Sequence, residues 1–70
     1  MNREYVAMFE PEGEGWTASV PDLPGCFSDG ATFEEASASI QEAIKLWLES
    51  AKSSGWPMPE PKARAQKFAV

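Results

Sequence analysis

Two aspartates are the residues whose type and position come closest to supporting catalysis. Asp22 and Asp29 lie in predicted loops beside strand ends, where clustered carboxylates can hold divalent metal ions for hydrolysis. Each of them also lies next to turn-forming residues, where an aspartate commonly accepts hydrogen bonds from nearby backbone. Because the turn interpretation explains both residues, we predict no catalytic residue and no metal site in this chain.

Cys26 is the only cysteine, and the sequence contains no histidine. A thiol nucleophile would therefore lack a histidine base, no intrachain disulfide can form, and there is no Cys/His cluster for zinc. We expect Cys26 to be a small buried apolar residue in a reducing compartment, and we expect no cofactor.

Charge is distributed unevenly along the chain, whose formal net charge is −5. Residues 1–44 hold nine carboxylates and one cation, whereas residues 45–70 hold five cations and two carboxylates. An acidic domain repels a phosphate backbone, so we expect no direct nucleic-acid binding. It attracts a basic protein instead, although the same charge can also serve only to keep a small domain soluble.

The length of 70 residues predicts a single small domain spanning residues 1–70. Domains of this size are marginally stable unless a disulfide, a metal or a partner subunit supports them. Because residues 5–9 are apolar on both faces of a predicted strand, we expect a homodimer or a larger oligomer. No segment resembles a signal peptide or a membrane span of about 20 residues, so we expect a cytoplasmic protein.

Three strands are predicted in the first part of the chain, at about residues 4–10, 16–20 and 26–28. The second alternates between apolar and polar residues, as is typical of a half-buried strand. The polar, glycine-containing segment 11–15 is too short for a crossover, so the first two strands should be antiparallel. Pro24 and Gly25 suit the central positions of a type II turn before the third strand.

One helix is predicted at about residues 33–53. Thr32 matches an N-cap residue, and Glu35 matches the capping-box residue that reaches back to its backbone N–H. Gly55 favours the end of the helix. An apolar stripe recurs at helical spacing and comprises Phe33, Ala36, Ile40, Ala43, Ile44, Trp47 and Ala51. Leu46 lies outside this stripe and Leu48 lies at its edge, and both are candidates for contact outside the fold.

Proline recurs in residues 57–61 and predicts an extended segment, the Pro-rich strap. Residues 66–70 have modest strand character and are predicted to add a short strand to a sheet edge. The expected fold class is therefore α+β: a three-stranded antiparallel sheet, one amphipathic helix and a short C-terminal strand, in the order β-β-β-α-β.

Three segments, together with the tyrosine-led first strand, follow the order of motifs in a known family. They are Val20-Pro21-Asp22-Leu23-Pro24-Gly25-Cys26, Asp29-Gly30-Ala31-Thr32-Phe33-Glu34-Glu35-Ala36 and Gly55-Trp56-Pro57-Met58-Pro59-Glu60-Pro61. With these segments the chain resembles the HicB-like antitoxin family over nearly its whole length. The resemblance implies a partial RNase H-like fold and an antitoxin that neutralises a small basic HicA-like toxin, which cleaves messenger RNA. Many members of that family also carry a DNA-binding domain, for which these 70 residues hold no counterpart, so we do not expect promoter binding by this chain.

The candidate partner-binding residues follow from the charge pattern and this resemblance. Carboxylates can compete for the arginines and lysines with which a toxin holds RNA, and exposed apolar residues can contact the same partner. The candidates are Glu12, Glu14, Glu34, Glu42, Leu46, Glu49 and Trp56. Two alternatives stay open: these carboxylates can be solvated charges only, and the chain can be a stand-alone oligomeric HicB-like protein with a small-molecule or accessory role and no toxin.

Overall fold

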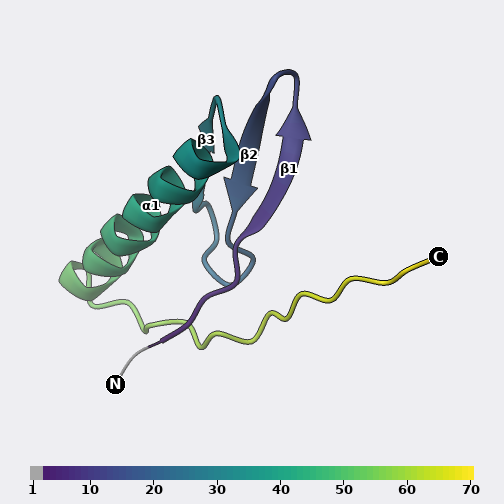
Figure 1. Cartoon of the computed structure of the whole chain (residues 1–70). Coiled ribbons are helices and arrows are strands. Elements are labelled where there is room, and N and C mark those ends of the chain that lie inside the picture. Colours follow the sequence, from purple (N-terminus) through teal and green to yellow (C-terminus); the bar gives the residue numbers. More distant parts are fainter. Residues whose placement is uncertain (1–2) are drawn as a thin grey trace.

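The computed structural model describes residues 3–70 and places one helix on one face of a small sheet (Figure 1). The strands are β1 (Met8–Glu12), β2 (Gly15–Ser19) and β3 (Phe27–Gly30), and the helix is α1 (Phe33–Ser53). The sheet is antiparallel, with the strand order β1-β2-β3. This is the α+β arrangement that the sequence predicts. Among the described residues, no helix is long and apolar enough to cross a membrane.

The first strand lies later in the chain than predicted. It begins at Met8 rather than near residue 4, and it continues through Pro11 to Glu12, inside the predicted loop. Pro11 is tolerated because β1 is an edge strand, where a missing backbone N–H costs no ladder hydrogen bond. The hairpin closes with two residues, and Gly13 has a φ of 59°, the positive value that a type II′ turn requires at its first central position.

The third strand also lies later than predicted, at Phe27–Gly30 rather than residues 26–28. Before it, the backbone N–H of Cys26 donates to the carbonyl oxygen of Leu23 over 3.0 Å, and Gly25 has a φ of 78°. These are the features of a type II turn, so the prediction for Pro24 and Gly25 is confirmed. The turn directs Leu23 inward, where it is 1% exposed.

The strand register gives the sheet two different faces. Phe9, Ala18 and Ser28 are paired across the strands and share the face toward α1, and the hydroxyls of Ser28 and Ser39 are hydrogen-bonded. On the other face, residues from all three strands remain uncovered within this chain. We call this surface the open face, and its residues are Met8, Glu10, Thr17, Ser19, Phe27 and Asp29.

The core is small and consists of residues from β2, the β2–β3 loop and α1. Its fully buried cluster comprises Ala18, Val20, Leu23, Cys26 and Ile40. Trp47 packs against this cluster as its spacing predicts, and its indole Nε1–H donates to the carbonyl oxygen of Pro24 over 2.8 Å. Phe33, also predicted for the core, is 42% exposed and packs at the rim against the rings of Phe9 and Trp16. It lies in the first turn of α1, beyond the region where helix and sheet enclose side chains.

The N-terminus of α1 is capped largely as predicted. The hydroxyl oxygen of Thr32 accepts a hydrogen bond from the backbone N–H of Glu35 over 3.1 Å. The Glu35 carboxylate accepts from the backbone N–H of Ala31 over 3.4 Å, one residue earlier than a capping box requires. Just before this cap, a Cβ atom on Gly30 would collide with the backbone nitrogen of Ala36. A side chain at position 30 would therefore push the helix away from the sheet.

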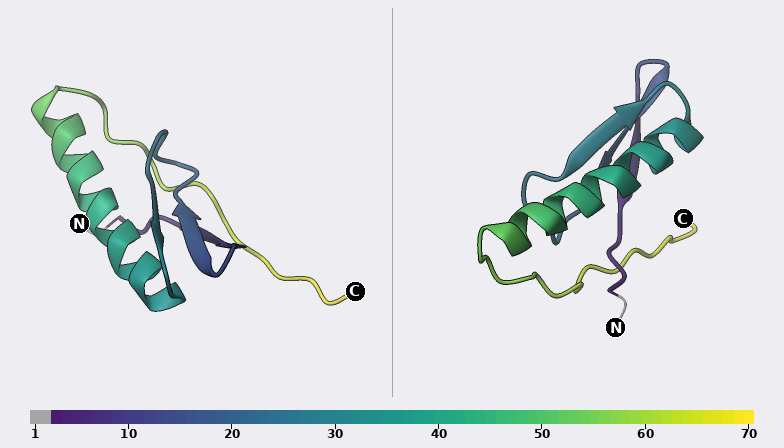
Figure 2. Two further views of the ribbon diagram at one scale, coloured as in Figure 1. Left: turned by 90° about the horizontal axis from the view of Figure 1, so that it is seen from above. Right: turned by 90° about the vertical axis from the view of Figure 1, so that its left-hand side faces the viewer.

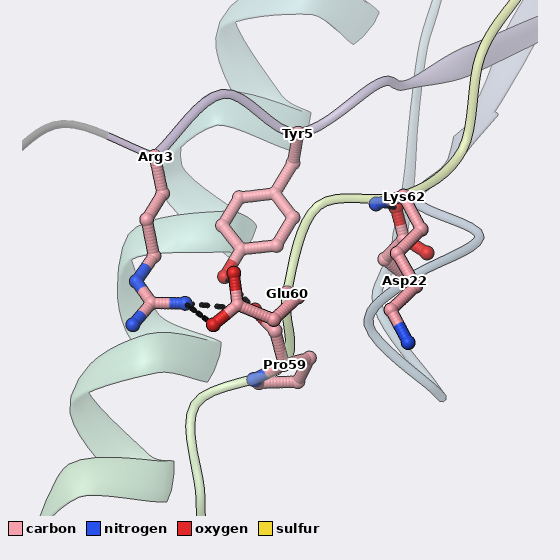
Figure 3. Close-up of polar contacts among 6 residues, drawn as sticks. All are labelled: Arg3, Tyr5, Asp22, Pro59, Glu60 and Lys62. Carbon is pink, nitrogen blue, oxygen red and sulfur yellow. Dashed lines mark hydrogen bonds and ion pairs between the residues drawn. The ribbon is translucent and has the colours of Figure 1, made fainter.

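The Pro-rich strap passes back beneath the N-terminal segment (Figures 1 and 3). The hydroxyl of Tyr5 donates to the carbonyl oxygen of Pro59 over 2.6 Å, and Arg3 contacts the same oxygen and the Glu60 carboxylate, at 3.2 and 3.5 Å. The predicted strand at residues 66–70 is wrong: these residues are exposed and pair with none of the strands within residues 3–70. Figure 1 shows the C-terminal segment running away from the sheet, so its backbone has no ladder partner there.

Trp47→Ala should destabilise the protein by about 3 kcal/mol, the lower end of the range for a large aromatic, because Trp47 is only half-buried. Leu46→Ala is the matched control on the same helix, because Leu46 is 62% exposed and its loss should cost less than about 0.5 kcal/mol. Urea unfolding followed by circular dichroism measures both. Equal shifts of the two midpoints would contradict this helix register.

Candidate protein-binding surface

An apolar hollow lies between the start of β3 and the C-terminal half of α1. It has a volume of about 280 Å³ and is lined by Gly25, Cys26, Phe27, Ala43, Leu46, Trp47, Ser50 and Trp56. Three of its large side chains are well exposed: Phe27 at 70%, Leu46 at 62% and Trp56 at 59%. We call this surface the apolar hollow. Convergence of exposed aromatic and aliphatic side chains around a depression is typical of a protein-binding surface.

The end of α1 places Trp56 at this hollow. Gly55 has a φ of 74°, and its backbone N–H donates to the carbonyl oxygen of Lys52 over 3.2 Å. The N–H of Trp56 donates to the carbonyl oxygen of Ala51 over 2.8 Å. These two bonds form a Schellman motif, which reverses the chain at the helix end. The reversal brings Trp56 back alongside the helix rather than leaving it to extend beyond the last turn.

Carboxylates border the hollow on the helix side. Glu42, Leu46 and Glu49 are spaced by four and three residues, so they lie in one row along α1, and all three are exposed. This row brings together three of the predicted partner-binding residues, and Trp56 joins them through the hollow that it shares with Leu46. Four of the seven candidates therefore form one surface.

The other three candidates lie toward the opposite end of the molecule. Glu12 ends β1, Glu14 lies in the following turn, and Glu34 lies in the first turn of α1. Figure 1 shows that this hairpin and the end of α1 are at opposite ends of the structure. Glu12 shares a shallow hollow with Asp29 and Glu35, but within residues 3–70 no group of three or more potential ligands is arranged to hold a metal ion.

Phe27 also belongs to this surface, although its position in the sequence predicts only a short strand. The one sequence signal for an exposed site is a large aromatic residue next to the first residue of that strand. Its position at the edge of the sheet, where it borders both the apolar hollow and the open face, depends on the register of β3 with β2, in which Phe27 pairs with Ser19. The sequence alone did not place that register.

Asp22 has a structural role, and its partners are distant in sequence. Its Oδ2 accepts hydrogen bonds from the backbone N–H groups of Lys62 and Ala63, at 2.9 and 2.8 Å. Figure 3 shows Asp22 of the β2–β3 loop beside Lys62 of the C-terminal segment. The expectation that Asp22 bonds nearby backbone is therefore wrong, because the segment that follows the Pro-rich strap brings two amides to it, from 40 and 41 residues away. Asp29 is exposed in β3.

Cys26 is 4% exposed, which confirms the expectation of a buried apolar residue. Burial raises the pKa of the Cys26 thiol, because the apolar surroundings disfavour the thiolate. The thiol therefore stays protonated at neutral pH and is a poor nucleophile. Cys26 also lines the apolar hollow, and its protonated thiol adds no charge to that surface.

Comparison with known proteins identifies relatives of this chain. Residues 5–69 match the family described as HicB-like antitoxin of bacterial toxin–antitoxin systems. A UPF0150 protein of Synechocystis is 44% identical over 57 residues, covering 80% of this chain and 72% of that protein. Antitoxin HicB 2 of Photorhabdus laumondii is 30% identical over 67 residues, covering 96% of this chain and 48% of that antitoxin. The chain thus spans about half of that antitoxin's length.

A solved structure has the same fold. It is described as a HicA3 and HicB3 toxin–antitoxin complex, and one of its chains superposes with a TM-score of 0.73 at 32% identity. The superposition covers 86% of this chain and 70% of the other. A similarity of this extent supports the sheet-and-helix arrangement and connects it to proteins that are found with a toxin.

Asp22→Ala should release the strap locally. Each hydrogen bond to a charged acceptor is worth about 1.5–3 kcal/mol, so amide exchange at Lys62 and Ala63 should accelerate about tenfold or more. Hydrogen exchange followed by NMR measures this effect, and Asp29→Ala is the control because Asp29 contacts no strap amide. Unchanged exchange at Ala63 would contradict the role of Asp22.

Proposed function

The chain belongs to the HicB-like antitoxin family, and we propose that it is a cytoplasmic protein-binding module that neutralises a small basic HicA-like toxin. It does so by binding the toxin rather than by catalysis. The family match over residues 5–69 supports this proposal, as does the similarity to a chain from a HicA3 and HicB3 complex.

The observation that carries the proposal is the apolar hollow with its adjoining row of carboxylates. Stable interfaces combine a few buried aromatic and aliphatic contacts with a polar rim that fixes orientation and accelerates association. Leu46 and Trp56 supply the apolar contacts, and Glu42 and Glu49 supply negative charge beside them. A basic toxin surface complements this arrangement in both respects.

Glu12, Glu14 and Glu34 have a different part in the proposal. They lie toward the other end of the molecule and carry no exposed apolar cluster comparable with the hollow. We assign them to the overall negative field, which speeds the encounter with a cationic partner and weakens as salt shortens its reach.

Self-association belongs to the same proposal. The core is small, and Met8 and Phe27 on the open face are 46% and 70% exposed. A homodimer or a larger oligomer would cover this apolar surface, which the single helix leaves exposed to water.

The apolar contacts should govern the lifetime of the complex. Trp56→Ala and Leu46→Ala should each accelerate dissociation of a cognate HicA-like toxin by about tenfold or more, if they fill a desolvated pocket. Surface plasmon resonance measures the rate, and a toxin RNA-cleavage assay measures the loss of inhibition. Thr17→Ala is the control, because Thr17 lies on the opposite face of the sheet from α1. Equal effects of all three substitutions would contradict the hollow as the binding surface.

The carboxylate row should govern the rate of association. Glu42→Lys with Glu49→Lys should slow association by about tenfold at low salt, and the difference should shrink as ionic strength rises. The double variant Glu12→Lys with Glu14→Lys is matched in charge and should have a smaller effect, because it is distant from the hollow. Unchanged kinetics in the first variant, or an identical loss in both, would contradict this assignment.

A further inference from the structure

We propose that the C-terminal arm, residues 64–70, of one copy binds the open face of a second copy, so that two chains exchange arms in a homodimer. This inference rests on the self-association proposed above and names the surfaces that produce it. The occupant of the open face is then a segment of the chain itself.

The open face consists of two neighbouring cross-strand rows. In one row, the apolar side chains of Met8 and Phe27 lie on either side of Ser19. In the other row, the carboxylates of Glu10 and Asp29 lie on either side of Thr17. Together they line a shallow hollow of about 670 Å³. Within residues 3–70 the one ion pair joins Arg3 to Glu60, so neither carboxylate of this face is neutralised by its own chain.

The C-terminal arm has the complementary composition. It carries Arg64 and Lys67, and its Phe68 is 75% exposed. All residues from 64 to 70 are exposed and belong to no helix or strand. Figures 1 and 2 show the arm leaving the body on the side of the sheet opposite α1 and running away from its own chain. It therefore presents cations and an aromatic ring that have no partner among residues 3–70.

The spacing of the arm fits the spacing of the rows. In an extended chain, alternate residues share one side, so Arg64 and Phe68 point the same way, about 13 Å apart. Neighbouring rows on one face of a sheet are about 7 Å apart, and an arginine side chain spans most of the remaining distance. Phe68 can then lie over Met8 and Phe27 while Arg64 reaches the carboxylates of Glu10 and Asp29.

The position of Asp22 makes this exchange inexpensive in conformational entropy. By accepting hydrogen bonds from the amides of Lys62 and Ala63, it fixes the point and direction at which the arm departs. Only the seven residues of the arm become ordered on binding, rather than the whole C-terminal segment. Two copies related by a two-fold axis satisfy both open faces at once, which closes the assembly at a dimer.

A charge exchange between two variants tests the proposal. The face variant is Glu10→Lys with Asp29→Lys, and the arm variant is Arg64→Glu with Lys67→Glu. Each alone should dissociate about tenfold or more readily than the unmodified chain, because its own arm and face now carry like charges. Mixing them should restore the dimer, because each arm then meets a face of opposite charge. Sedimentation equilibrium measures all three samples, and circular dichroism verifies folding.

Two further chains complete the experiment. A chain ending at Ala63 should be monomeric, whereas Lys45→Glu with Lys52→Glu, which changes the same charge on α1, should dimerise normally. A monomeric unmodified chain, a dimeric truncated chain, or a mixture that fails to restore the dimer would each overturn the proposal. Toxin inhibition by the truncated chain separates the two hypotheses. If the truncated chain inhibits the toxin and the unmodified chain is a monomer, the arm exchange is refuted and the antitoxin function stands.

Discussion

The packing of a single helix against a single face of the sheet is the constraint on which the rest of this structure depends. The contact is close because Gly30 lacks a side chain where the backbone of Ala36 approaches. Apolar side chains of the second strand and the helix fill the space between, and Leu23 closes it from the loop. One helix can cover only one face, so the other face of all three strands remains open, and the chain retains exposed apolar surface that larger domains bury.

The two ends of the chain are held together by contacts that connect distant segments. Tyr5 and Arg3 contact the Pro-rich strap at Pro59. Asp22 accepts hydrogen bonds from the two amides just after the strap, those of Lys62 and Ala63. These bonds hold the segment that precedes β1 against the segment that follows α1, although neither segment belongs to a strand. They also determine where the exposed arm leaves the body. A carboxylate that resembles a catalytic candidate in the sequence is therefore part of the scaffold.

The exposed surfaces divide into an apolar hollow beside α1 and an open face across the sheet, with Phe27 contributing to both. Each combines a few large apolar side chains with carboxylates, which is the composition of a surface that binds a cationic protein segment. A basic toxin and the chain's own basic arm are partners of the same physical type. Under the two proposals made above, the apolar hollow binds an external partner and the open face binds a second copy.

The sequence by itself determined the order and type of the three strands and the helix, the helix cap at Thr32, the turn at Gly25 and the burial of Cys26 and Ile40. Each depends on local backbone preference or on a periodic apolar pattern, and both are determined by residues that are close together in the sequence. Only the tertiary structure decided that Asp22 binds amides 40 residues away, that Phe33 remains at the rim, and that residues 66–70 form no strand. It also brought Phe27 and Trp56 to one hollow. These outcomes depend on strand register and on the path of the strap, which are set by contacts between segments that no local pattern connects.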